Sequence, residues 1–204
     1  MARTLRLFAG LMAAAACSLG QDSGDAAPAA PQLAVLMKFD VRPAAAVLES
    51  MQSEVARIFE PAGVRVAWRL AEQNDGRELF PHVVVIRIRG VCHTQPSSWD
   101  EVHMLLDDPE LASASVRDGK ALPFAEIHCD RVSAFLRPWR KAEQTATLGA
   151  AMGRVIAHEL YHMLTNTLTH GVGVLSKASV TSMELGRSGR FSQDEIELVK
   201  KSVQ

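Results

Sequence analysis

The fold of this chain is decided by the stretch TLGAAMGRVIAHELYHMLTN, residues 147–166. Its apolar residues recur every three or four positions and share one broad face: Leu148, Met152, Val155, Ile156, Leu160, Met163 and Leu164. This periodicity predicts a long core helix. Asn166 is expected to end it, because asparagine tolerates the left-handed backbone conformation that commonly follows a helix.

The second half of this helix carries the segment His158-Glu159-Leu160-Tyr161-His162, and His170 follows the predicted helix end. Two imidazoles four residues apart lie about 40° from one another around a helix, so both can reach one ion. Glu159 lies beside that pair, where its carboxylate could act on a water as a general base. Three protein ligands and one open position are typical of catalytic zinc. The sequence therefore predicts a Zn²⁺ site of His158, His162 and His170, with Glu159 as the catalytic residue.

Strand and helix patterns alternate on the N-terminal side of this helix. Strands are predicted at 33–41, 64–70, 82–89 and 122–129, with a helix at 44–60. Residues 90–120, rich in Pro, Ser, Asp and Gly, predict a long excursion with a short helical piece at 101–106.

Two further helices are expected. One runs from 132 to 144 with an interruption at Pro138, and a capping box at Ser192-Gln193-Asp194-Glu195 opens the other, which continues to about Lys201. The order predicts an α+β fold: a mixed sheet of about four strands, an active-site helix and a C-terminal helix. With 204 residues, 48% of them hydrophobic, the chain is long enough for one domain with a sizeable core.

The first 31 residues have a different character. Arg3 and Arg6 precede an apolar run at 7–16, and small residues follow up to Gly20, which is the order of a secretory signal peptide. The apolar run is shorter than the roughly 20 residues that a membrane-spanning helix needs. Residues 21–31, rich in Gly, Ala and Pro, predict a flexible linker.

We therefore predict a signal peptide at 1–20, a linker at 21–31 and a domain at 32–204 that is exported to the periplasm or secreted. The residues Ala14-Ala15-Ala16-Cys17 resemble a lipoprotein signal, so a lipid anchor at Cys17 stands as an alternative to cleavage near Gly20.

Export leaves two cysteines, Cys92 and Cys129, in an oxidising compartment, where an even pair predicts a disulfide. Two buried free thiols or a metal ligand remain as alternatives. The net charge is −1 and no block of Lys or Arg is present, so nucleic acid is not an expected partner.

The 158–162 segment and His170 resemble the zincin metallopeptidases, and a third histidine after a turn is similar to the metzincin pattern. The chain departs from that pattern, because its first and third histidines are twelve residues apart instead of ten. Leu168 stands where metzincins have the third histidine. Uncharacterised bacterial zincin-like proteins have similar spacing.

The resemblance implies several further features. A methionine lies beneath the metal in such proteins; here Leu175 takes its place in the segment Gly173-Val174-Leu175, and Met183 is a candidate substitute. The resemblance also implies that the strand at 122–129 is the edge strand above the metal, where an extended peptide substrate pairs.

A second zincin branch, the gluzincins, takes its third ligand from a glutamate on a later helix. Glu184 lies 22 residues after His162, close to that spacing, and is the alternative third ligand. We expect His170 instead, because the residues around Glu184 have a weak helical pattern. The remaining histidines have no partner at ligand spacing: His82, His93, His103 and His128.

These patterns predict an exported zinc metallopeptidase that hydrolyses peptide or protein substrates. Two alternatives remain open. One is a zincin-fold protein that binds zinc or a partner without hydrolysis. The other is an exported binding module in which the histidine pair is incidental.

Overall fold

The computed structural model describes residues 32–93, 110–136, 144–171, 173 and 175–204. The predicted signal peptide, the linker and the lipid anchor at Cys17 lie outside this part of the chain, as does the short helical piece at 101–106. Within the described residues, no helix combines the length and the apolar composition that crossing a membrane requires.

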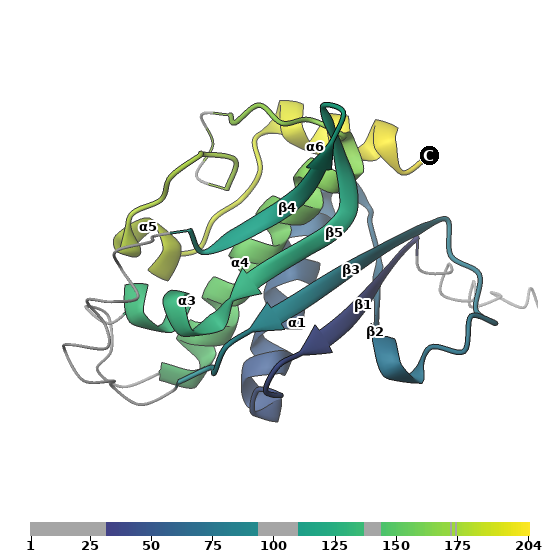
Figure 1. Ribbon diagram of the computed structural model, residues 1–204. Helices are drawn as coiled ribbons and strands as arrows, with labels where there is room; N and C mark the ends of the chain where they lie inside the picture. The colour runs from purple at the N-terminus through teal and green to yellow at the C-terminus, as the bar shows by residue number, and fades with distance from the viewer. Residues whose placement is uncertain (1–31, 94–109, 137–143, 172, 174) are drawn as a thin grey trace, which may run out of the picture.

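The centre of the fold is a five-stranded mixed sheet in the order β2-β1-β3-β5-β4 (Figure 1). Four strands are parallel: β1 (Leu33–Phe39), β2 (Val66–Leu70), β3 (His82–Arg89) and β5 (Lys120–His128). The fifth, β4 (Ala112–Arg117), runs antiparallel to β5 at one edge of the sheet. This arrangement confirms the predicted α+β class.

Two long helices cover one face of the sheet. α1 (Ala45–Phe59) and α4 (Gln144–Thr165) pack against each other behind the strands in Figure 1. The core between these layers is aliphatic, and its central side chains are fully buried: Val35, Ile86, Ile88, Ile127, Met152 and Ile156. Burial of this surface, at about 25 cal/mol per Å² of apolar area, is the main force that holds the layers together.

Shorter elements complete the fold. They are the 3₁₀ turns η1 (Glu60–Ala62) and η2 (Ala71–Gln73), and the helices α3 (Cys129–Phe135), α5 (Ser182–Gly186) and α6 (Gln193–Ser202). The capping box predicted at Ser192 is present and opens α6. The helix expected at 132–144 begins earlier, at Cys129, and α4 also begins earlier than expected, at Gln144.

The prediction that the 122–129 strand forms the edge of the sheet was wrong. That strand is β5, which lies between β3 and β4, and the edge is β4, within the stretch expected to be irregular. The sequence of β4, Ala-Ser-Ala-Ser-Val-Arg, contains no alternation of large apolar and polar residues. An edge strand of small, half-exposed side chains lacks the pattern by which a strand is recognised.

A pair of cysteines connects the end of β3 to the start of α3. Cys92, after β3, and Cys129, at the start of α3, lie at disulfide distance with their Cα atoms 5.0 Å apart, as predicted. This pair is compatible with an extracellular location.

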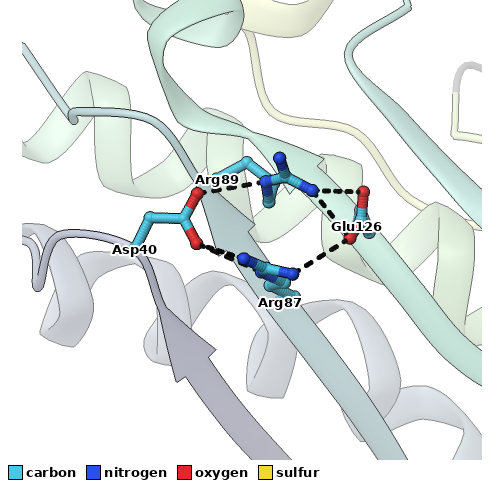
Figure 2. A network of polar contacts seen from close by, with 4 residues as sticks. All are labelled: Asp40, Arg87, Arg89 and Glu126. Carbon is cyan, nitrogen blue, oxygen red and sulfur yellow. Dashed lines mark hydrogen bonds and ion pairs between the residues drawn. The ribbon is translucent and has the colours of Figure 1, made fainter.

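A charged network crosses the neighbouring strand ends (Figure 2). Asp40 accepts hydrogen bonds from Arg87 and Arg89, and Glu126 of β5 accepts from Arg89 at 3.0 Å and lies 3.8 Å from Arg87. The hydrogen bond from Arg87 is the main cause that lowers the pKa of Asp40. Because these side chains are partly exposed, the network contributes modestly to stability.

Candidate metal centre

Three histidine side chains converge at the C-terminal end of α4. His158 and His162 lie one turn apart on the helix, and His170 returns to them after the helix ends. One ring nitrogen from each lies within 4.8 Å of the other two. The His170 ring is stacked on the His158 ring, with centroids 5.4 Å apart. These are the three residues that the sequence predicted as metal ligands.

Asn166 makes this return of the chain feasible. Its φ of 50° is left-handed, as predicted for the helix terminator, and its side-chain oxygen accepts the backbone N–H of Ala121 at 3.0 Å. The end of α4 is thereby attached to the start of β5, and the four residues that lead to His170 leave the helix in a fixed direction.

Main-chain carbonyls orient the two helical imidazoles. The His158 Nδ1–H donates to the Leu175 carbonyl at 2.6 Å, and the His162 Nδ1–H donates to the Thr167 carbonyl at 2.6 Å. Because a carbonyl oxygen can only accept, the proton of each neutral ring is on Nδ1 and the lone pair is on Nε2. The two Nε2 atoms face each other at 3.0 Å.

This donor set fits a metal ion. Zinc–nitrogen bonds of about 2.0–2.1 Å in tetrahedral geometry place two ligand nitrogens about 3.3 Å apart, close to the observed separation. Burial lowers the pKa of His158 to about 4, against the opposing hydrogen bond to Leu175. Burial also lowers the pKa of His162. Both rings are therefore neutral near pH 7, the form that binds a metal. Imidazole nitrogens suit zinc and also copper, iron or nickel.

Glu159 lies beside this cluster and is 5% exposed. Burial, with a smaller contribution from the charge of Glu110, raises the pKa of its carboxyl to about 7. A backbone hydrogen bond from Ala114 opposes both effects. This contact places the edge strand β4 against the carboxylate. A carboxyl whose pKa is raised toward neutrality is suited to accept and return a proton.

The cluster opens into a cleft of about 650 Å³. Its walls come from the edge strand, from α4 and from the chain that follows the third histidine: Ala112, Ser113, Ala114, Val155, His158, Glu159, His162, Leu175, Val180, Glu184 and Leu185. β4, which packs against α4, and the segment with α5 both line the cleft.

Met183, the candidate substitute for a methionine beneath the metal, lies on α5 with its side chain 47% exposed. Leu175 is buried, and its backbone carbonyl accepts the hydrogen bond from His158. This carbonyl is a functional group that sequence reasoning missed, since no side-chain pattern marks it.

Glu184 is occupied elsewhere. Its carboxylate pairs with Lys177 at 2.6 Å and accepts hydrogen bonds from the backbone and hydroxyl of Thr181. The hydrogen bond from Lys177 is the main cause that lowers its pKa to about 2. The expectation of weak helicity here was wrong, because Thr181 and Glu184 form a capping box that opens α5. Among the described residues, the group that could hold a metal ion comprises the three histidines without Glu184.

The other histidines of the described part of the chain, His82, His93 and His128, do not join the cluster, and His103 lies outside that part. In comparisons with known proteins, no protein-family model matches the chain, and no match was found among the curated proteins or the solved structures.

Proposed function

We propose that this protein is an exported zinc-dependent metallopeptidase with a zincin-like active site. One observation carries the proposal: three imidazole nitrogens within 4.8 Å of one another lie beside the buried carboxyl of Glu159, in a cleft bordered by a sheet edge. Three nitrogen ligands with an adjacent acid–base group are the requirements of metal-assisted hydrolysis.

In this proposal each residue has a separate role. His158, His162 and His170 hold the ion, and Glu159 takes a proton from the attacking water and gives it to the leaving amine. A bound zinc ion supplies Lewis acidity, which acidifies a water molecule and polarises the carbonyl of the peptide bond. The burial of Glu159 supports its role, because a carboxyl with a pKa of about 7 can both accept and release a proton near neutral pH.

The edge strand supports a peptide as the substrate class. β4 pairs with β5 on one side only, and within the described residues no strand pairs with its other side. Backbone groups along that free edge could form hydrogen bonds with an extended peptide, in the manner of an added strand. Because Ala114 of β4 contacts Glu159, a peptide bound along this edge would pass close to the candidate general base.

The proposal is tested with Glu159→Gln. The variant should keep its zinc, because Glu159 is not a ligand, and should lose at least about 100-fold in peptide hydrolysis, the usual contribution of a general base. The measurements are metal content and digestion of a peptide library followed by mass spectrometry. Glu197→Gln, the same change at a half-exposed position of α6, is the control.

Retention of full activity by Glu159→Gln would show that the assigned mechanism is wrong. A parent protein that binds zinc and leaves the whole library intact would instead favour the alternative of a non-catalytic zinc-binding protein.

A further inference from the structure

A short turn joins the third histidine to the group that orients the first. We define the 171–176 turn by its described residues Gly171, Gly173, Leu175 and Ser176. The Gly171 N–H donates to the Ser176 carbonyl at 2.9 Å, and the Ser176 N–H donates to the Gly173 carbonyl at 3.1 Å. The turn begins directly after His170 and contains the Leu175 carbonyl that accepts from His158. Its position therefore affects two of the three candidate ligands.

The carboxylate of Glu195, from the first turn of α6, lies against this turn. Glu195 is 7% exposed. A Cβ atom added to Gly171 would be 2.7 Å from Glu195 Oε1, and one added to Gly173 would be 3.0 Å from Oε2. At Gly171 such a Cβ would also lie 2.5 Å from the Ser176 Oγ, so a side chain there would force Ser176 or Glu195 to shift, whereas at Gly173 the neighbours would have to give by a few tenths of an ångström.

Electrostatic interaction adds to this contact. The negative charge of Glu195 acts on the His158 ring. A buried carboxylate whose charge reaches His158 favours a divalent cation at that ring, because charges interact more strongly in the protein interior than in water.

We infer that Glu195 is a positioning residue of the metal centre: its buried carboxylate supports the 171–176 turn and thereby fixes His170 and the carbonyl partner of His158. The inference rests on the metal-binding part of the proposed function and is independent of peptide hydrolysis. Glu195 does not touch the ion in this account; it acts through the turn and through its charge at His158.

Glu195 also has an ordinary structural role, and the test must separate the two. Its Oε2 atom accepts the Ser192 N–H at 2.7 Å, and the Ser192 hydroxyl accepts the Glu195 N–H in return, which completes the capping box of α6. Ser192→Ala removes half of this box but leaves the carboxylate against the turn. It is the matched control, because it weakens the cap that Glu195 also belongs to.

The experiment measures zinc affinity by chelator competition in the full chain, and the thermal unfolding midpoint of the metal-free protein. Glu195→Gln keeps the side-chain volume and the oxygen that accepts from Ser192, and it should weaken zinc binding about 10- to 100-fold, as supporting groups around metal sites do. The visible absorption of the Co²⁺-loaded variant should also differ from that of the parent. Ser192→Ala should lower the unfolding midpoint at least as much and keep the zinc affinity within about threefold of the parent.

The inference is overturned if Glu195→Gln binds zinc like the parent, or if Ser192→Ala weakens zinc binding equally, since capping alone would then explain the effect. A parent that binds no zinc would overturn this inference and the proposed function together. A parent that binds zinc but cleaves no peptide would remove the proposed function alone, and the affinity ratio of the variants would still decide the role of Glu195.

Discussion

At the scale of single residues, the two helical imidazoles are held by main-chain carbonyls. A carbonyl does not titrate, so the Nδ1 proton of His158 and of His162 has a fixed acceptor over the whole pH range. A side-chain acceptor could be removed by one substitution, whereas these acceptors move only if the backbone after α4 moves. The geometry of the centre therefore depends on how the chain returns at Thr167 and Leu175.

Residue-scale features were predictable where they are local. The convergence of His158 and His162 follows from helix geometry, and the left-handed Asn166 follows from the conformational tolerance of its side chain. The partners Leu175 and Glu195 could not be predicted, because they come from elements that approach α4 only in the folded chain. The helix around Glu184 was not predicted for a local reason, since the capping box that starts at Thr181 was not recognised.

At the scale of elements, the packing of α1 against α4 depends on small residues. A Cβ atom added to Gly149 would lie 2.5 Å from the Val47 carbonyl oxygen and 2.5 Å from the Ser50 Cβ. One turn later, a Cβ atom on Gly153 would lie 2.7 Å from the Met51 carbonyl oxygen. The helix that carries the histidines is therefore placed by backbone contact with α1.

Gly149→Ala tests this contact, because two effects predict opposite signs. Intrinsic helix propensity alone predicts that alanine raises the free energy of unfolding by about 1 kcal/mol. We expect a decrease of about 1–3 kcal/mol, because the added methyl group meets backbone that cannot rotate away. Urea denaturation measures the difference. A variant as stable as the parent would show that the two helices are not in the close contact described.

The long helices and buried strands were predictable from periodicity, and β4 was not. Helix and strand patterns extend over many residues in α1, α4 and β3, where one face or both faces are buried. β4 is exposed along its free edge and packs only small side chains, so its conformation is set by pairing with β5. The strand that borders the cleft, β4, is thus the strand with the weakest sequence pattern.

At the scale of the whole molecule, one buried carboxylate connects both helices to the wall of the cleft. Glu54 of α1 accepts hydrogen bonds from Arg57 and from Arg154 of α4. Arg154 also donates to the Leu185 carbonyl and Arg57 to the Gly189 carbonyl. The chain that forms one side of the cleft is therefore held by the same charges that join α1 and α4.

This network predicts a pH dependence of stability. Burial would raise the pKa of Glu54, but hydrogen bonds and charge from Arg57 and Arg154 outweigh it and hold the pKa below the usual 4.5. The ionised group therefore stabilises the fold above about pH 4.5, and that contribution is lost as the pH falls through the lowered pKa. Glu54→Gln should cost about 3 kcal/mol at pH 7, because it leaves Arg154 buried without its partner.

The stability difference between parent and Glu54→Gln should shrink as the pH falls below about 4.5, because the parent then loses its own carboxylate charge. Denaturation at several pH values measures it, and Glu49→Gln, on the exposed face of α1, is the matched control. A difference that stays constant from pH 7 to pH 3 would contradict the assigned role of the charge.

The most direct test of the central claim is the zinc content and zinc affinity of the purified protein beside His170→Ala and Glu184→Ala. We predict a single tightly bound zinc ion in the parent and in Glu184→Ala. In His170→Ala the loss of affinity should exceed the roughly 10- to 100-fold loss typical of supporting residues. Zinc retained by His170→Ala, or a well-folded parent that takes up none when zinc is supplied, would contradict the three-histidine centre.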